Sequence, residues 1–329
     1  MMWPFTGPGA AWLVLYVLTF ALHAVFVSYV VGGTVYALVQ AVRKPDDAIA
    51  ERVRDRLPFM LGCGITAGVA PLLFLQLLHQ RRFYTANLVA GPRWGAVVPA
   101  LIVGFYALYL AKASVRLRKV ALGVGAGCFV FVAWSWTEIH LLMEDDAAWR
   151  AMYAAGRRVY GEASVAPRLL VWLGAMATLF ATVSLWWASG AERRRLVVIG
   201  VAGRAVAAIA CAWLIARGAS TEQGAHGWLY LALAALAVEA VGWGWTWVAP
   251  GGAGPLLVTG AGTAALVAAA VVREAPRIAL LEPPRPAAAE AGGLPLFVVT
   301  ALAGAAAIAW IVRTVASTPP ESGDGDERS

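Results

Sequence analysis

Long runs of hydrophobic residues separated by short polar segments make up most of the chain. We predict nine membrane-spanning helices from these runs, at residues 12–40, 58–78, 95–113, 119–143, 168–189, 195–216, 227–248, 255–272 and 293–313. A helix rises about 1.5 Å per residue, so each run is long enough to cross a hydrocarbon core of about 30 Å. The pattern predicts an all-α polytopic membrane protein, a bundle of about nine transmembrane helices.

The composition agrees with a membrane protein, because 60% of the residues are hydrophobic and 14% are charged, against about 25% charged residues in soluble domains. The net charge of +7 lies in short connections beside the helix ends, where membrane topology and anionic lipid headgroups explain it. We therefore expect a lipid bilayer and other membrane subunits as partners, and no nucleic acid. The three cysteines form no CxxCH pattern, which argues against a covalently attached c-type haem.

The distribution of Lys and Arg predicts how the bundle lies in the membrane. The connections after the first and third spans are rich in basic residues, so the positive-inside rule places the N-terminus outside. We expect a multi-pass protein of the bacterial inner membrane, with one transmembrane domain over residues 1–316 and a disordered tail at 317–329. Residues 43–57 predict a short surface helix, and residues 144–167 predict an interfacial amphipathic helix.

A single histidine, His23, lies near the middle of the first hydrophobic run, which no charged residue interrupts. It is the only residue at that depth of the run that is able to ligate a metal or exchange a proton. The competing interpretation is a hydrogen-bonded core histidine. His79 ends the second run, and His140 lies near the end of the fourth.

Glu138 and His140 are two residues apart and therefore face directions about 200° apart on a helix, so they do not bind one metal together. His140 lies near Glu144 and Asp145, which favours a hydrogen-bonded surface histidine over a haem ligand or a proton relay. Glu138 lies deeper, and we expect it to be either protonated or paired with Arg204, because an isolated charge in the hydrocarbon core is unfavourable.

Arg204 and Glu239 are charged residues deep inside the sixth and the seventh predicted spans. They are suited to pair with each other as a structural staple. The rival interpretation is a proton path through Glu239 or a clamp for haem propionates at Arg204, because Arg binds carboxylates through two parallel hydrogen bonds.

Two stretches resemble subunit I of the cytochrome bd-type quinol oxidases. The first is LTFALHAVFVSYVVGGTVYAL in the first span, and the second is GITAGVAPLLFLQLLHQRRFYTANLVAGP in the second span and its exit. The positions in register are Gly68, Pro71, Gln76 and Tyr84. The resemblance is strongest over residues 12–190. It implies nine spans with the N-terminus outside and a b-type haem whose iron is ligated by His23.

The chain departs from the pattern of that family at several positions. The span 95–113 lacks the glutamate of the family's third helix, the span 168–189 lacks its histidine, and the connection at residues 217–227 is too short for its quinol-binding loop. The resemblance therefore implies a shortened relative that keeps at least one haem, or a scaffold without haem, and not a self-sufficient oxidase.

Other residues are candidates for contacts with the haem or with its redox partners. His79 or His140 is the candidate for a second haem ligand, and Arg204 and Glu138 are candidate neighbours of the cofactor. A quinol or partner site is expected at Gln76, Arg81, Arg82 and Tyr84. The expected function is a subunit of a respiratory complex that passes electrons between quinol and a partner, such as a c-type cytochrome or an oxidase site.

Two alternatives to this function remain open. One is a haem-free scaffold or anchor subunit of a larger complex. The other is a transporter of protons or small solutes that uses Arg204 and Glu239.

Overall fold

The computed structural model describes residues 7–219, 221–249, 252–280, 298–304, 306, 310 and 313, with side chains described from residue 10 onward. The described part of the chain is helical and has no strand. Eight of its helices are long and apolar enough to cross a membrane. The protein is thus an all-α polytopic bundle. Most of the predicted ninth span, 293–313, and all of the predicted tail, 317–329, lie outside the described residues.

The spanning helices are long and the helices between them are short. The elements in chain order are α1 (Gly7–Arg43), α2 (Ala48–Leu78), α3 (Gln80–Ala90), α4 (Pro92–Gly95), α5 (Val97–Ala113), α6 (Arg118–Leu142), α7 (Asp146–Ala154), α8 (Val165–Ser184), α9 (Gly190–Ala216), the 3₁₀ turn η1 (Gln223–Ala225), α10 (His226–Val248) and α11 (Gly254–Ala279). The first eight predicted spans correspond to α1, α2, α5, α6, α8, α9, α10 and α11.

The prediction of a separate surface helix at 43–57 is wrong. Asp47 caps the start of α2 by accepting a hydrogen bond from the Ala50 backbone N–H at 3.0 Å, and the helix then continues through Pro58 into the membrane-spanning part. The polar residues of this segment are the first turns of α2. Of the predicted interfacial segment 144–167, Asp146–Ala154 forms the helix α7 and the last three residues are the first residues of α8.

The predicted end of the eighth span at residue 272 is also wrong. Helix α11 continues to Ala279 and passes through Pro276. The additional turns carry Glu274 and Arg277, whose side chains are both fully buried. The extension brings two charged side chains into the bundle. The hydropathy pattern predicts a connection at these residues.

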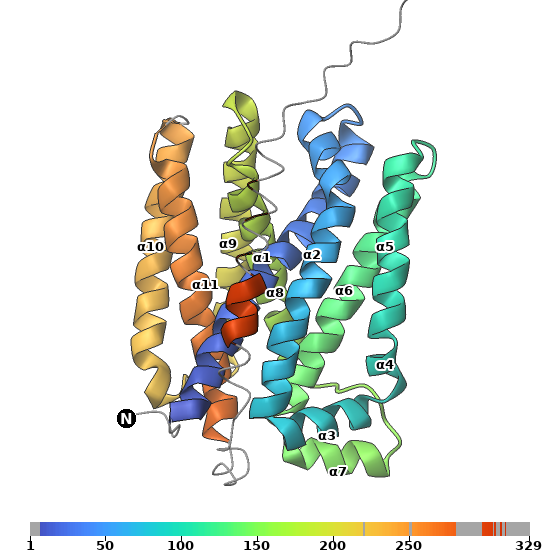
Figure 1. Cartoon of the computed structure of the whole chain (residues 1–329), viewed down its shortest axis with the longest axis vertical. Coiled ribbons are helices and arrows are strands. Elements are labelled where there is room, and N and C mark those ends of the chain that lie inside the picture. Colours follow the sequence, from blue (N-terminus) through green and yellow to red (C-terminus); the bar gives the residue numbers. More distant parts are fainter. Residues whose placement is uncertain are drawn as a thin grey trace, which may run out of the picture.

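The eight spanning helices form four sequential hairpins, α1–α2, α5–α6, α8–α9 and α10–α11. Helix α1 crosses the bundle obliquely and packs against α2, α6, α8 and α11 (Figure 1). We call the end with the connections 44–47, 114–117 and 185–189 the upper end. The opposite end, where α3, α4, α7 and the last turns of α11 lie, is the lower end (Figure 1).

Small residues let two of the helices approach closely. A Cβ atom on Gly174 of α8 would lie 2.6 Å from the backbone oxygen of Gly203 on α9, and one on Gly203 would lie equally close to the Gly174 oxygen. Close contact of this kind is how membrane helices associate, because lipid tails supply no hydrophobic force between them.

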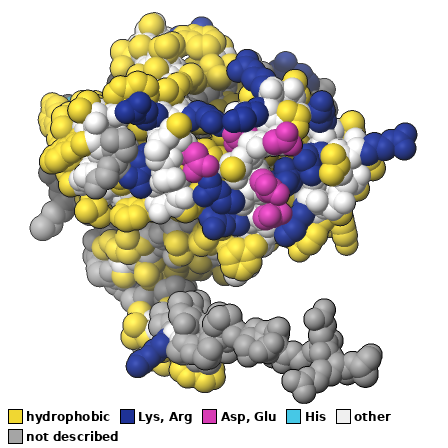
Figure 2. All heavy atoms as spheres, turned by 90° about the horizontal axis from the view of Figure 1, so that it is seen from above, with side chains coloured by type: hydrophobic (Ala, Val, Ile, Leu, Met, Phe, Trp, Pro, Cys, Tyr) yellow, Lys and Arg dark blue, Asp and Glu magenta, His cyan; other side chains and the backbone are white. Residues whose placement is uncertain are grey.

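The upper end carries many of the basic residues of the chain. Figure 2 shows Lys and Arg side chains distributed around a smaller group of Asp and Glu side chains on this face. The connections after the first and third predicted spans both lie here. The positive-inside rule therefore still predicts that the upper end faces the cytoplasm and that the N-terminus lies outside.

Candidate functional site

His23 lies against α2, where its Nδ1 contacts the Gly64 backbone oxygen at 2.9 Å. A carbonyl oxygen only accepts, so Nδ1 carries a proton and donates it to this bond. In the neutral ring the lone pair is then on Nε2. Gly68 makes room for the ring, because a Cβ at that position would lie 2.8 Å from its Cε1 atom. The ring is partly exposed.

A second group of polar residues gathers at the lower end. His79, the C-cap of α2, contacts Glu274 of α11 through Nε2 and Oε1 at 2.8 Å, and both side chains are fully buried. The other Glu274 oxygen pairs with Arg277, which also donates to Nδ1 of His140 on α6. One chain of contacts therefore joins three helices that are far apart in sequence.

The contacts of the two histidines fix what their rings are able to do. A guanidinium has only donors, so Nδ1 of His140 accepts from Arg277 and the ring proton is on Nε2. Both nitrogens of His140 are thereby unsuited to ligate haem iron without loss of the Arg277 contact. His79 holds Glu274 with Nε2, and its Nδ1 is buried without a partner among the described residues. His140 is hydrogen-bonded, but its partner is Arg277 and not Glu144 or Asp145, and its ring is only partly exposed.

Arg273 adds a second cation from α11 to this group. It donates to the Tyr16 hydroxyl of α1 at 2.7 Å. Its guanidinium carbon lies 4.2 Å from the ring centre of Phe20 and 5.2 Å from that of Trp172 on α8. Two cation–π contacts thus hold Arg273 in place between α1 and α8.

Arg168 of α8 and Glu144, which follows α6, complete the group. Arg168, Arg273 and Arg277 all lie within electrostatic range of both His140 and Glu144. Burial raises the pKa of the Glu144 carboxyl above its ordinary value, although Arg277 and Arg168 act in the opposite direction. We call these residues the lower-end cluster: Tyr16, His79, His140, Glu144, Arg168, Arg273, Glu274 and Arg277.

Glu138 does not pair with Arg204. Its partner is Arg93 of α4, with which it forms an ion pair, and its Oε2 accepts from the Tyr160 backbone N–H at 3.3 Å. Arg93 also lies over the Trp134 ring, 4.7 Å from its centre. Glu138 thus fastens α4 and the segment after α7 onto α6.

The Tyr160 hydroxyl donates to Asp145 at 2.8 Å, and Asp145 caps the start of α7 through the Ala148 N–H. Burial, followed by the hydrogen bond to Asp145, raises the pKa of Tyr160 above its ordinary value. This hydroxyl therefore stays protonated and holds the loop against α7 as a structural contact.

Arg204 and Glu239 pair with each other between α9 and α10. The distance from Arg204 Nη2 to Glu239 Oε2 is 2.7 Å, and Trp243 donates to Glu239 Oε1 at 3.2 Å. Glu239 is buried, whereas the Arg204 side chain is 28% exposed. The geometry is that of the predicted structural staple.

The four residues expected at a quinol or partner site lie at the end of α2 and on α3, but they have different contacts. The exposed Tyr84 hydroxyl donates to Gln76 Oε1 at 2.9 Å. Arg82 binds Asp146 at 2.6 Å and the Met143 backbone oxygen at 2.9 Å, so it holds α7 against α3. Arg81 is exposed.

Sequence reasoning missed Tyr16, Arg168, Arg273, Glu274 and Arg277. A signal for the last three was present, because Glu274 and Arg277 have the i,i+3 spacing of neighbours on one helix face. Hydropathy alone ends the span at residue 272, because charged residues follow the hydrophobic run. Nothing in the sequence indicated that Tyr16 and Arg168 lie near them.

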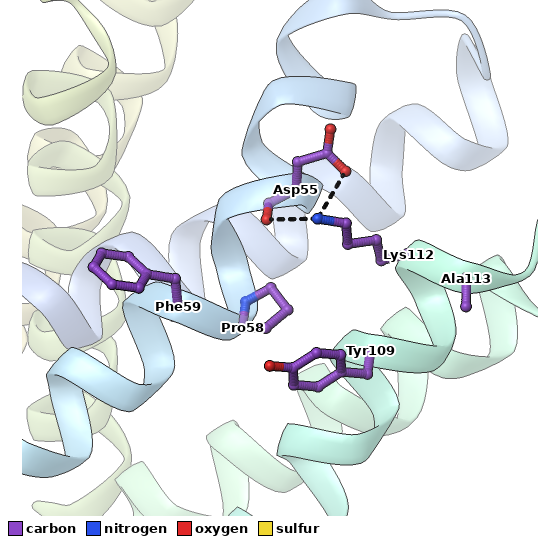
Figure 3. Close-up of a pocket in the computed structure, with 6 residues that line it drawn as sticks. All are labelled: Asp55, Pro58, Phe59, Tyr109, Lys112 and Ala113. Carbon is purple, nitrogen blue, oxygen red and sulfur yellow. Dashed lines mark hydrogen bonds and ion pairs between the residues drawn. The ribbon is translucent and has the colours of Figure 1, made fainter. Parts of the chain in front are cut away.

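A separate cleft lies near the upper end, between α2 and α5 (Figure 3). Its lining is formed by Asp55, Pro58, Phe59, Tyr109, Lys112 and Ala113. The Lys112 ammonium spans the cleft to the Asp55 carboxylate at 3.7 Å and to its backbone oxygen at 3.4 Å. The two charged side chains of the cleft, Lys112 and Asp55, are therefore paired with each other.

The described residues contain no group of three or more His, Cys, Asp or Glu side chains placed to hold a metal ion. Compared with known proteins, the chain matches no family model, no curated protein and no solved structure. Its candidate chemistry rests on two places, the His23 ring and the lower-end cluster.

Proposed function

We propose that the chain is an integral membrane subunit of a bacterial respiratory electron-transfer complex and binds one b-type haem through Nε2 of His23. The observation that carries the proposal is the hydrogen bond from Nδ1 to the Gly64 carbonyl. Histidines that ligate metals commonly donate their other ring nitrogen in this way, which fixes the tautomer and orients the ring.

The residues around His23 fit an axial haem ligand. Gly64 holds the ring and Gly68 lets it pack closely against α2, while the partial exposure of the ring leaves an approach from outside the helix pair. A haem bound there would supply a one-electron carrier whose potential is set by burial and nearby charge. The chain's own contribution is to keep the imidazole neutral and to fix the orientation of its ring.

The proposal is for a haem with one histidine ligand. His79 and His140 are engaged by Glu274 and Arg277, and Gly68 precedes His79 by eleven residues, a helix rise of about 16 Å. A single protein ligand leaves a coordination position for a small molecule. We therefore expect a high-spin spectrum that changes when carbon monoxide is added.

The complex is proposed to lie in the bacterial inner membrane and to exchange electrons between quinol and a partner subunit or a c-type cytochrome. The exposed Gln76–Tyr84 pair on α2 and α3 is the candidate contact for that exchange. Affinity purification from native membranes tests this part, and it fails if no haem protein accompanies the chain.

The first test compares the purified wild type with His23→Ala and His226→Ala by reduced-minus-oxidised spectra and pyridine haemochrome analysis. His226 is a matched control, because it is an exposed histidine whose Nε2 contacts the Thr221 backbone oxygen at 3.2 Å. We expect about one b-type haem per chain in the wild type and in His226→Ala, and none in His23→Ala. A colourless wild type from haem-replete cells would contradict the proposal and leave the scaffold function.

A further inference from the structure

The lower-end cluster contains more positive than negative charge. Arg273 and Arg277 share one carboxylate, that of Glu274, and Arg168 adds a third positive charge to the cluster. Glu144 makes no ion pair with them in the structure, and the three arginines outnumber the carboxylates of Glu274 and Glu144 even when both are counted. Arg277 and Glu274 are both fully buried, where an uncompensated charge is strongly unfavourable.

The cluster also has hydrogen-bond donors without acceptors. The Nε atoms of Arg168, Arg273 and Arg277 are buried and have no partner among the described residues, and the same holds for Nε2 of His140. The three arginine atoms are N–H donors, and the Arg277 contact makes His140 Nε2 a donor too. A group that satisfies them must therefore be rich in acceptors.

Charge and hydrogen bonding thus indicate the same missing partner, an anion with several oxygens. A water molecule satisfies one or two donors but does not offset the charge. A phosphate group does both, because its oxygens accept several charge-assisted hydrogen bonds from arginine.

Two arginines of the cluster are partly exposed, so a ligand is able to reach them. Arg273 retains 19% of its side-chain exposure, and Arg168 is also only partly buried. The rings of Phe20 and Trp172 lie on the Arg273 guanidinium, so apolar surface adjoins the charged groups. A ligand with an acidic head and an apolar body suits this combination.

We propose that Arg168, Arg273 and Arg277 of the lower-end cluster bind the phosphate of an anionic phospholipid. The site shares no residue with the His23 site, and the proposal does not depend on haem. The bound phosphate offsets the surplus charge and accepts from the donors that the protein leaves unpaired.

The experiment measures phospholipid retained by the purified full chain, using native mass spectrometry and phosphorus assay. The variants are Arg168→Gln/Arg273→Gln and, as a matched control, Arg150→Gln on the exposed side of α7. We expect about one anionic phospholipid per chain in the wild type and in Arg150→Gln. The double variant should retain about tenfold less, because charge-assisted hydrogen bonds are lost.

A second measurement distinguishes the source of the phosphate. Delipidated protein is titrated with phosphatidylglycerol micelles, phosphatidylcholine micelles or inorganic phosphate, and the unfolding midpoint is followed. We expect phosphatidylglycerol alone to raise the midpoint of the wild type, by about 5 °C, and to have no such effect on the double variant. An equal rise of the midpoint with inorganic phosphate would support an anion site but contradict a lipid ligand, because free phosphate alone would then bind.

Three results would overturn the proposal: no acidic ligand on the wild type, equal loss of lipid from Arg150→Gln, or loss of haem in place of lipid from the double variant. If the double variant does not fold, Arg273→Lys replaces it. That variant keeps the charge but not the planar fork of donors, and it should still bind phosphatidylglycerol more weakly than the wild type.

Discussion

Asp47 at the upper end of the bundle and Glu274 at the lower end are both buried carboxylates beside an arginine, but only the Asp47 network leaves no buried arginine donor without an acceptor among the described residues. At the upper end, Asp47 accepts from the Tyr36 hydroxyl at 2.9 Å and the Ala50 N–H at 3.0 Å, and it pairs with Arg195. At the lower end, Glu274 is equally well held, but the arginine side of the network has donors without acceptors.

Exposure of the arginine explains the difference between the two networks. The Arg195 side chain is 35% exposed, so water accepts hydrogen bonds from the guanidinium N–H groups that Asp47 does not bind. Arg277 is fully buried and has no such outlet. A fully hydrogen-bonded ion pair whose arginine reaches solvent has a structural role. A buried excess of positive charge indicates that the site binds a further component.

The largest effect is expected from Glu274→Gln, which leaves Arg277 buried without a countercharge. We expect the free energy of unfolding in detergent to fall by about 3–5 kcal/mol. The matched control is Glu239→Gln, because its partner Arg204 is 28% exposed and stays partly hydrated, so that the loss should be about 1–2 kcal/mol. Equal losses of unfolding free energy in the two variants would contradict the argument that a fully buried arginine depends more on its carboxylate than a partly exposed one does.

A smaller effect is expected from Asp47→Asn, which weakens the fully satisfied network at the upper end. Loss of the charge should lower the free energy of unfolding by about 2 kcal/mol at neutral pH. Chemical denaturation of the wild type and the variant at pH 7 measures this difference.

The same variant tests a pH dependence. Burial acts to raise the pKa of Asp47, but the Ala50 N–H, Arg195 and Tyr36 outweigh it and hold the pKa below its ordinary value. A lowered carboxyl pKa stabilises the folded state above the ordinary value of about 4, and this contribution is lost as the pH falls towards the folded-state pKa. The stability difference between wild type and Asp47→Asn should therefore shrink below about pH 4, and a constant difference would contradict this assignment.

The smallest effect is expected at the cleft between α2 and α5, where Lys112 and Asp55 are about half exposed, at 49% and 51%. Water and salt screen such a pair, so Lys112→Gln should change the free energy of unfolding by less than about 0.5 kcal/mol. Thermal unfolding at low and high salt checks this. A loss comparable to that of Asp47→Asn would show that exposure does not separate the strong pairs from the weak ones.

The sequence was sufficient to predict the eight spanning helices that the structure describes, because the hydrocarbon core requires long apolar runs. It also predicted the Arg204–Glu239 pair, for which few other charged residues were available at that depth. It did not predict that α11 continues to Ala279. Hydropathy treats Glu274 and Arg277 as two charges, whereas in the structure each offsets the other.

The partners of the candidate residues were harder to predict, because they depend on which helices are neighbours. Glu138 was assigned to Arg204 as one of two options, yet Arg93 on the short α4 lies closer and takes that place. The structure joins His79 and His140 through Glu274 and Arg277, and places His23 beside Gly64 and Gly68.

Helix α1 has 37 residues and is about 55 Å long, far more than the thickness of a hydrocarbon core of about 30 Å. Its slant is held by contacts with α2, α6, α8 and α11 (Figure 1). Tilt set by neighbouring helices does not adjust freely to the lipid. The bundle therefore determines its own hydrophobic thickness, and a bilayer of another thickness has to deform around it.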